Sequence, residues 1–450
     1  MYIRRTIDKT LLDWKNAAVH KPLLLRGARQ VGKTSAIRHL GESFTYYAEL
    51  NFEERPQLAQ WFEGELDVRD IISKIGVLLN IPVRPGDTLL FLDEIQACPK
   101  ALNALRFFKE KLPDLHVIAA GSLLEFVLDD IPTFAVGRLR SVFIFPLSFD
   151  EFLSAINEQG LVEVKNAASP DAPIDEVFHE RLKELFRIYL IVGGMPEAVS
   201  SWITTGQYSE VAHIQNDIIT GYSADFSKYK KRINPDLLRI CMISVAHQIG
   251  NKFVLNRVSP DHQGKQIKEA LRLLILAGLV IPVTRTAANG LPLESGADHS
   301  YRKYLFVDTG LLLRILALNM GYANIGAEVL LQEETALVNK GSLTEMAAGL
   351  EIIKYSDAYE FTNLYYWVRE EQGSSAEVDY LFVKEGVVYP VEIKSETKGG
   401  MKSMYYFLGK KGGRLGIRSS LENFSRYRSS AGYEVLVYPL YALSTLRHEL

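Results

Sequence analysis

Cysteine is scarce in this sequence: Cys98 and Cys241 are the only two among 450 residues, and they do not form a C-x-x-C pair. Two cysteines are too few for a framework of disulfides, and their spacing does not suit a structural zinc site. This usage is typical of a protein kept in a reducing compartment. We therefore expect a cytoplasmic location.

A long hydrophobic run is also missing. The longest apolar stretch, residues 271–283, spans about 13 residues, whereas a membrane-spanning helix needs about 20. The N-terminal residues MYIRRTIDKTLLDWKN contain no apolar core of the kind that secretory signals have. We expect neither an export signal nor a membrane span.

The chain has little net charge, since its formal charge is −3. The total charge therefore indicates neither a nucleic acid nor a membrane surface as a partner, and any basic surface must be local. The composition, 47% hydrophobic and 23% charged, is typical of a soluble globular protein. At about 150 residues per domain, 450 residues predict three domains.

A phosphate-binding motif is the clearest feature that the sequence does have. The stretch LLLRGARQVGKTS places G-x-x-x-x-G-K-T directly after an apolar run. Gly27 and Gly32 let the backbone amides wrap around phosphate oxygens, Lys33 supplies a positive charge for the β- and γ-phosphates, and the Thr34 hydroxyl is a ligand for Mg²⁺. The residues expected to bind the nucleotide are Gly27, Ala28, Arg29, Gln30, Val31, Gly32, Lys33, Thr34 and Ser35.

The context of this motif supports a functional interpretation. We expect a strand at 22–26 before the loop and a helix at 33–40 after it, so that the positive end of the helix dipole faces the anion. The alternative is a chance match in a glycine-containing turn. A strand before the motif and a helix after it are the setting that the motif requires. ATP with Mg²⁺ is the expected ligand.

A second motif, TLLFLDE at 88–94, reads as a buried strand that ends in two carboxylates. An acidic residue at the carboxyl end of a neighbouring parallel strand faces the Mg²⁺ and the phosphates. Asp93 is the expected metal-side carboxylate, and Glu94 is the expected base that orients the attacking water. The alternative is a polar turn that ends the strand, which becomes improbable beside a phosphate-binding loop.

Two further candidates follow the next strands. A buried strand at 115–120 leads to Ser122, which either contacts the γ-phosphate or the attacking water, or caps the helix that follows. Arg138 precedes a strand at 141–145, and it is either a salt-bridge residue or an arginine finger for its own or a neighbouring subunit.

These segments, in the order GARQVGKTS, LLFLDEIQ, IAAGSLLEF, Gly137–Arg138 and PLSFDEFL, resemble an AAA-type ATPase. They are similar to a widespread bacterial and archaeal family of ATP-binding proteins. The resemblance covers about the first 230 residues, and it implies a five-stranded parallel core, with Ser122 as a sensor and Arg138 as a finger or sensor arginine.

The remaining elements of the first half are predicted from periodicity. An N-terminal amphipathic helix within 1–20 offers Leu11, Leu12, Trp14 and Val19 to the core. The other predictions are a strand at 46–53, helices at 66–79, 101–112 and 177–192, and a surface loop at 154–174. The turn Gly193–Pro196 either contacts an adenine ring or simply separates two helices.

The charge balance changes at residues 228–272, which contain ten basic and three acidic residues. The same window predicts a helix at 235–249, a turn at Gly250 and Asn251, a helix at 263–276 and a strand, LVIPVTR. This order suggests a winged helix-turn-helix that presents residues 264–272 to DNA. Winged helices also bind proteins, and a charge cluster is often a solvated face, so both alternatives remain open.

The last 110 residues contain a second set of catalytic residue types. Asp379 is followed after twelve residues by Glu392 and Lys394 on a strand, as in the restriction-endonuclease-like PD-(D/E)xK fold. Strand alternation places Glu392 and Lys394 on one face, so that two carboxylates bind Mg²⁺ while the lysine orients a water. Glu345, on an expected helix at 343–355, adds a third ligand. The site is either active or a retained core without catalysis.

The sequence thus predicts an α/β protein with a P-loop AAA-type parallel sheet, a helical lid, a winged-helix middle domain and a nuclease-like α/β C-terminal domain. The expected boundaries are 1–150, 151–227, 228–300 and 301–450. The expected function is ATP hydrolysis coupled to DNA handling. The alternative is a nucleotide-controlled switch or scaffold whose inactive nuclease-like domain binds a protein partner. The candidate partners are DNA, a further copy of the chain in a homo-oligomer, or another protein.

Overall fold

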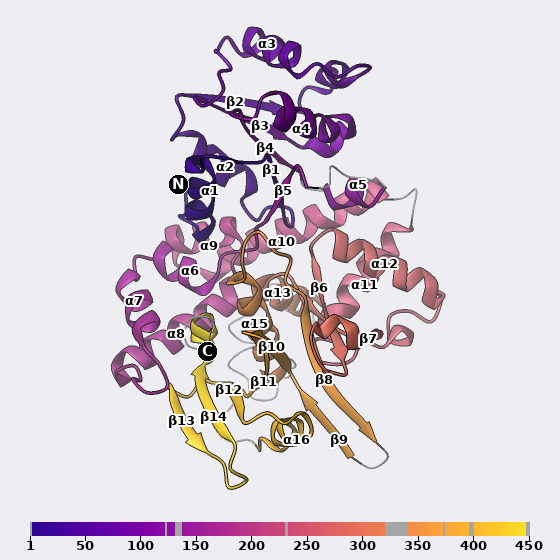
Figure 1. The fold of residues 1–450 in the computed structure, drawn as a ribbon. Coiled ribbons are helices and arrows are strands. Elements are labelled where there is room, and N and C mark those ends of the chain that lie inside the picture. The colour runs from indigo at the N-terminus through magenta and orange to yellow at the C-terminus, as the bar shows by residue number, and fades with distance from the viewer. Residues whose placement is uncertain are drawn as a thin grey trace. The chain divides into compact units, whose positions relative to one another are not determined.

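The chain folds into two compact units (Figure 1). Unit 1 comprises Met1–Pro146, Leu276–Leu279 and Asp357–Phe361, and unit 2 comprises the rest. The computed structural model describes residues 2–121, 124–130, 137–229, 233–319, 340–371, 374–395 and 400–446. Among these residues no helix combines the length and the apolar character needed to cross a bilayer.

Unit 1 is a parallel sheet with helices. Its strands are β1 Leu23–Arg26, β2 Tyr46–Asn51, β3 Thr88–Asp93, β4 His116–Ala120 and β5 Arg140–Phe143. Its helices are α1 Thr6–Asn16, α2 Lys33–Gly41, α3 Val68–Leu79, α4 Pro99–Lys111 and α5 Leu124–Asp130, with short 3-10 turns at Pro56–Phe62 and Ile95–Ala97. The strand order is β2-β3-β4-β1-β5, and every pairing is parallel.

The sequence explains this sheet. All residues of β3 and β4 are buried, because a parallel sheet covered by helices on both faces favours continuous apolar strands rather than alternation. The predicted strands and helices agree with these elements to within a few residues. The predicted apolar face of α1 is partly wrong: Leu11 and Trp14 are buried, but Leu12 is 42% exposed and Val19, beyond the helix end, is 80% exposed.

Two short segments from later in the chain complete unit 1. The backbone N–H of Phe143 donates to the carbonyl oxygen of Ala358, which covers part of the edge of β5. Gly278 lies against the loop between β1 and α2, where a Cβ atom would lie 3.1 Å from the Ala28 nitrogen. Sequence periodicity does not reveal these contacts, because they join residues that are distant along the chain.

Unit 2 begins with helices. They are α6 Phe149–Ala155, α7 Gln159–Ala167, α8 Glu176–Val192, α9 Pro196–Thr205, α10 Tyr208–Asp225, α11 Pro235–His247 and α12 Gly264–Leu276. Helix α7 corrects the predicted loop at 154–174. Its inward face is formed by Leu161, Val162 and Lys165, and the buried Lys165 ammonium pairs with Asp150 at 3.1 Å. The helix was not predicted because a lysine interrupts the apolar residues on its inner face.

The second half of unit 2 contains two sheets. Its elements are β6 Val280–Thr286, β7 Ala297–Phe306, α13 Thr309–Asn319, α15 Lys340–Lys354, β8 Leu364–Glu371, β9 Ser374–Val378, β10 Tyr380–Lys384, β11 Val387–Ile393, α16 Lys402–Lys411, β12 Leu415–Ser420, β13 Ser425–Arg428 and β14 Glu434–Pro439. The sheet orders are β7-β6-β8-β9 and β10-β11-β12-β14-β13.

The order helix, turn, helix, strand predicted for the basic window is present as α11, α12 and β6. Gly250 has a φ of 73°, and a Cβ there would lie 2.4 Å from the Ser342 hydroxyl, so the turn needs glycine. Strand β6 pairs antiparallel with β7 and parallel with β8. The C-terminal part of the chain therefore contributes a strand to this sheet.

The C-terminal sheet has a parallel centre, because β11, β12 and β14 pair in parallel, and antiparallel hairpins at both edges. Asp379, the carboxylate predicted to bind Mg²⁺, lies at a junction between two strands. Glu377 and Val378 end β9, and Asp379 is the single residue between β9 and β10. The chain thus passes from one sheet to the other at the expected metal-binding aspartate.

Candidate functional site

The loop between β1 and α2 has the backbone of a phosphate cradle. Gly27 and Gly32 have φ values of 149° and 94°, and a Cβ at Gly27 would lie 2.1 Å from the carbonyl oxygen of Ile144. Side-chain-bearing residues are strained at such φ values, and the close contact leaves no space for one. Both glycines of the motif are therefore required by geometry.

Lys33 reaches back over this loop. Its side chain is buried, and its ammonium donates to the carbonyl oxygens of Gly27 at 2.8 Å and Ala28 at 2.7 Å. Burial lowers the pKa of Lys33 to about 8, against the opposing charges of Glu94 and Asp93. The ammonium is thus held beside the cradle, where the negative charge of a bound phosphate would compensate for the water that the ammonium loses on burial.

The carboxylate of Asp93 lies beside the first turn of α2. The Thr34 hydroxyl donates to Asp93 Oδ2 at 3.4 Å, and the Glu94 N–H donates to Asp93 Oδ1 at 3.0 Å. Burial raises the pKa of Asp93 to about 6, and the neighbouring Glu94 charge raises it further. The two expected Mg²⁺ ligands, Thr34 and Asp93, are therefore close together. Asp93 does not end the strand next to β1, as was expected, because β4 lies between β1 and β3.

Glu94 is held by a residue that the sequence interpretation missed. Glu94 has a φ of 47°, and the Gln96 side-chain amide donates to its carboxylate at 2.5 Å. A Cβ at Gly121 would lie 1.9 Å from Gln96 Oε1, so the glycine at the end of β4 leaves space for this glutamine. The sequence feature that could have identified Gln96 is its position two residues after Glu94 in DEIQ.

Arg26, at the end of β1, is a second missed residue. Its guanidinium donates to both carboxylate oxygens of Glu125, with Nε at 2.5 Å from Oε1, and it lies over the Phe143 ring. The Glu125 charge also acts on Lys33. A bidentate pair of this kind fixes the start of α5 next to the loop.

A second group of charged side chains lies in unit 2. Glu345 on α15, Glu377 at the end of β9 and Asp379 each offer a carboxylate oxygen, and these oxygens lie within 4.8 Å of one another. We call these three residues the acidic cluster. The sequence predicted Glu345 and Asp379 but not Glu377 as a candidate ligand.

Lys303 on β7 enters the acidic cluster. It is 1% exposed, and its ammonium donates to Glu345 at 2.8 Å and also pairs with Glu377. Burial raises the pKa of Glu345 to about 8, although the Lys303 charge acts in the opposite direction. The lysine was missed because it lies in a strand, YRKYLF, that is distant in sequence from the nuclease-like motif.

The remaining two expected residues lie beside this group. The Lys394 ammonium donates to Glu392 Oε1 at 2.7 Å, and the Ile393 N–H donates to Asp379 Oδ2 at 2.7 Å. Glu392 is buried, and its Oε2 has no hydrogen-bond partner among the described residues. Burial raises the pKa of Glu392 to about 7, and the Asp379 charge adds to this effect. The structure therefore brings together all four predicted side chains.

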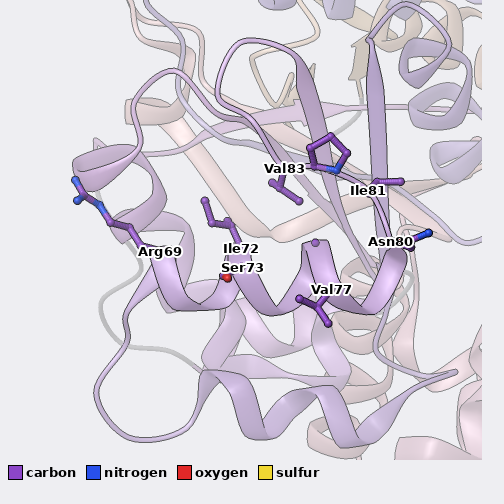
Figure 2. A pocket seen from close by; sticks show the side chains of 9 residues that line it. Arg69, Ile72, Ser73, Val77, Asn80, Ile81 and Val83 are labelled. Atoms are coloured by element: carbon purple, nitrogen blue, oxygen red, sulfur yellow. The ribbon is translucent and has the colours of Figure 1, made fainter.

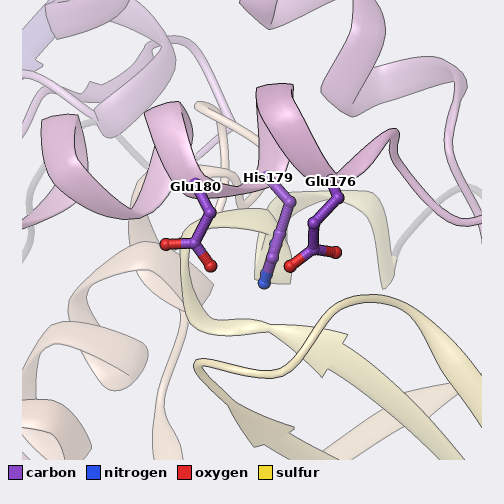
Figure 3. A group of neighbouring side chains, drawn as sticks. All are labelled: Glu176, His179 and Glu180. Atoms are coloured by element: carbon purple, nitrogen blue, oxygen red, sulfur yellow. The ribbon is translucent and has the colours of Figure 1, made fainter.

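A third group of titratable side chains lies on α8. Glu176, His179 and Glu180 project from one side of α8 (Figure 3), but the His179 Nδ1 lies 2.7 Å from the Tyr441 hydroxyl, and Glu180 pairs with Lys183. These contacts give the group a structural role.

A hollow of about 620 Å³ is lined by α3 and by the segment that directly follows it (Figure 2). Ile72, Val77, Ile81 and Val83 are among the residues that line it, and Val77 is 82% exposed. No residue of the phosphate cradle lines this hollow.

Three segments of the chain match family models. Residues 19–153 match a model described as an AAA domain. This match supports an AAA-type ATPase domain in the first third of the chain. Residues 183–321 and 340–441 match models described as domains of unknown function, DUF8612 and DUF4143. None of the curated proteins compared with the chain matches it.

Solved structures similar to the chain include the Walker-type ATPase PABY2304 of Pyrococcus abyssi, with 15% identity and a TM-score of 0.45 over 70% of this chain and 96% of that one. The Aeropyrum pernix ORC1 protein, solved in complex with DNA, is 13% identical, with a TM-score of 0.30 over 70% and 91%. Unliganded Pif1 from Bacteroides sp. is 15% identical, with a TM-score of 0.21 over 40% and 52%. At such low TM-scores these likenesses carry no argument about function.

Two predicted residues of the AAA domain are not part of the cradle described above. Ser122 lies outside the described residues. Arg138 precedes β5, and because β5 runs parallel to β1, it lies at the amino edge of the sheet, whereas Lys33 lies at the carboxyl edge. The Arg138 guanidinium donates to Glu110 on α4 at 2.6 Å.

The turn Gly193–Pro196 has a packing role inside unit 2. The Gly194 N–H donates to Asp308 at 2.6 Å, and its carbonyl oxygen accepts from the Leu147 N–H at 2.6 Å. A Cβ at Gly193 would lie 2.1 Å from Asp308 Oδ1. These contacts give a packing reason for both glycines.

Proposed function

We propose that this protein binds and hydrolyses ATP with Mg²⁺ in its AAA domain and uses the reaction to act on DNA. The observation that supports hydrolysis is the convergence of Lys33, Thr34, Asp93 and Glu94 at one edge of the sheet. The donor set fits the cofactor, because a hydroxyl and a buried carboxylate are oxygen ligands of the kind that Mg²⁺ prefers.

In this proposal the cradle and Lys33 bind the phosphates, Thr34 and Asp93 hold the metal ion, and Glu94, oriented by Gln96, accepts a proton from the attacking water. Bound Mg²⁺ would offset the negative charge that develops on the phosphates. Arg138 would act as an arginine finger only toward a neighbouring subunit, because it lies at the opposite edge of its own sheet from the cradle, and its pairing with Glu110 favours the salt-bridge alternative.

The second part of the proposal is a metal-dependent hydrolytic site in a restriction-endonuclease-like C-terminal domain. Asp379, Glu392 and Glu345 would bind a divalent ion, and Lys394 would orient a water. The unpartnered Oε2 of the buried Glu392 supports this, because a buried carboxylate oxygen without a hydrogen bond needs a cation or a proton.

The metal site is tested by calorimetric titration of the full chain with Mn²⁺. The full chain is needed because β6 pairs with β8 and because β7 carries Lys303, which contacts Glu345. We expect Asp379→Ala to abolish binding in unit 2 and metal-dependent cleavage of DNA while ATP hydrolysis persists. Mn²⁺ binding that is unchanged in the variant would refute the site.

A basic surface on α12 supports DNA as the substrate. Lys265 and Lys268 are exposed, whereas Arg272 is paired with Glu269 at 2.8 Å. With the hairpin of β6 and β7, this helix has the element order of a winged helix-turn-helix.

The alternative function is a nucleotide-controlled switch whose C-terminal domain binds a protein partner without catalysis. The observation that favours it is the ion pairing of Lys303 within the acidic cluster. Measurement of the ATPase rate with and without DNA separates the two functions. Stimulation by DNA supports the first, and an unchanged rate supports the switch.

A further inference from the structure

A buried ammonium already lies among the carboxylates of the acidic cluster. Lys303 donates to Glu345 and pairs with Glu377, and the charge of Asp379 also acts on it. The three carboxylate oxygens lie within 4.8 Å of one another, a spacing suited to one shared cation. The ammonium therefore fills the position at which a metal ion would bridge Glu345 and Glu377.

Lys303 makes these ion pairs from a buried position rather than from the protein surface. Lys303 is paired with Val283 in the β6–β7 hairpin, its side chain is 2% exposed, and its ammonium lies 5.2 Å from the centre of the Tyr366 ring. Burial of an ammonium is costly unless carboxylates and hydrogen bonds compensate it. The cluster and the lysine consequently stabilise each other.

The carboxylates of Glu392 and Asp379 differ from those of Glu345 and Glu377 in their contacts. Glu392 Oε2 is buried without a partner, and Asp379 Oδ2 accepts a single backbone hydrogen bond from Ile393. The ion pairs that Lys303 makes in the described structure are with Glu345 and Glu377, and neither of these two carboxylates takes part in them. Glu345 and Glu377, by contrast, are engaged by the ammonium.

We propose that Lys303 is a resident cation that substitutes for a metal ion at Glu345 and Glu377, so that a divalent ion gains these two ligands only by displacing the ammonium. This inference rests on the proposed metal site and adds a regulatory contact to it. The contact comes from the β6–β7 hairpin, so movement of the Lys303 side chain controls how many carboxylates the ion can use.

The test compares the full-length chain with Lys303→Met, which keeps much of the side-chain length but removes the charge. Mn²⁺ binding is followed by calorimetry, and thermal unfolding is followed with and without Mn²⁺. Because a nearby positive charge and direct occupation of the ligands both oppose metal binding, we expect the variant to bind Mn²⁺ at least about ten-fold more tightly. Without metal its Tm should fall, and Mn²⁺ should restore it.

Lys354→Met is the matched control. The Lys354 side chain is 5% exposed, it pairs with the buried Glu351 at 3.4 Å, and it lies outside the acidic cluster. Its loss should also lower the Tm, but Mn²⁺ should not restore the stability. Recovery in both variants would show a general effect of the ion and would overturn the proposal.

Two further outcomes separate this inference from the proposed function. If the unmodified chain binds Mn²⁺ and Lys303→Met binds it equally or more weakly, the metal site stands and the inference is wrong. If neither chain binds Mn²⁺, the proposed metal site fails and this inference fails with it.

Discussion

Lys33 and Glu94 lie at the same sheet edge but serve different steps. We expect Lys33→Ala to lose ATP binding, because its ammonium is held over the phosphate cradle by the carbonyl oxygens of Gly27 and Ala28. Glu94→Gln should keep ATP binding and lower kcat by about 10²- to 10³-fold, since it removes the water-orienting group and leaves the cradle intact. Fluorescent-nucleotide binding and phosphate release measure the two effects. Equal loss of ATP binding in both variants would refute this division of roles.

At the scale of an element, helix α12 carries the proposed DNA contact. Replacement of both Lys265 and Lys268 by glutamine should weaken DNA binding and reduce the slope of log K against log salt by about 0.9 for each lost phosphate contact. Fluorescence anisotropy at several salt concentrations measures this slope. The control replaces Lys74 and Lys100 of unit 1, which are 46% and 56% exposed. An unchanged slope in the α12 variant would indicate that these two lysines face solvent and do not contact DNA phosphates.

The packing of α1 against the start of β4 predicts sensitivity to acid. His20 and His116 stack with ring centres 3.9 Å apart, and Trp14 meets both rings edge-on. Burial lowers the pKa of His116 to about 4, and the His20 charge adds to this effect; burial also lowers the pKa of His20. Lys15, Lys109 and Asp114 are the charged groups that act on the pair.

The folded pKa of His116 is below that of the unfolded chain, so the unfolded chain binds more protons between about pH 6.5 and pH 4. Stability is complete above about pH 6.5 and falls as the pH drops toward 4, by up to about 3 kcal/mol for His116 alone. Urea unfolding at pH 7.5, 6 and 5 measures this loss. His116→Gln should flatten the dependence, and replacement of His213, an exposed histidine on α10 with 69% side-chain exposure, should not.

At the scale of the whole molecule, unit 1 depends on a segment from far along the chain. Gly278 has a φ of 72° and lies against the Ala28 backbone in the phosphate cradle. Gly278→Val should therefore displace the cradle and weaken ATP binding by about ten-fold or more, which corresponds to about 1.4 kcal/mol. Gly86→Val is the matched control, because Gly86 has a φ of 84° and its Cβ would meet open space. Equal ATP affinity in both variants would contradict the supporting role of Gly278.

The parts of the fold that the sequence predicted well are those set by local patterns. Strand β3 could be predicted because a continuous apolar run ends in two carboxylates, and the cradle because Gly27 and Gly32 flank a fixed spacing before Lys33. The loop predicted at 154–174 was wrong because Lys165 lies on the inner face of α7, where its partner Asp150 comes from another helix.

The sequence alone determined the chemistry of the phosphate cradle, because glycine conformation and strand and helix propensities act over a few neighbouring residues. It also identified four side chains, Glu345, Asp379, Glu392 and Lys394, that the fold does bring together. Tertiary structure decided the rest: Lys303 joins the acidic cluster through a strand of the β6–β7 hairpin, and Arg138 falls at the far edge of its own sheet. The reason is physical, since strand order and the pairing of buried charges depend on contacts between distant residues, which no local pattern encodes.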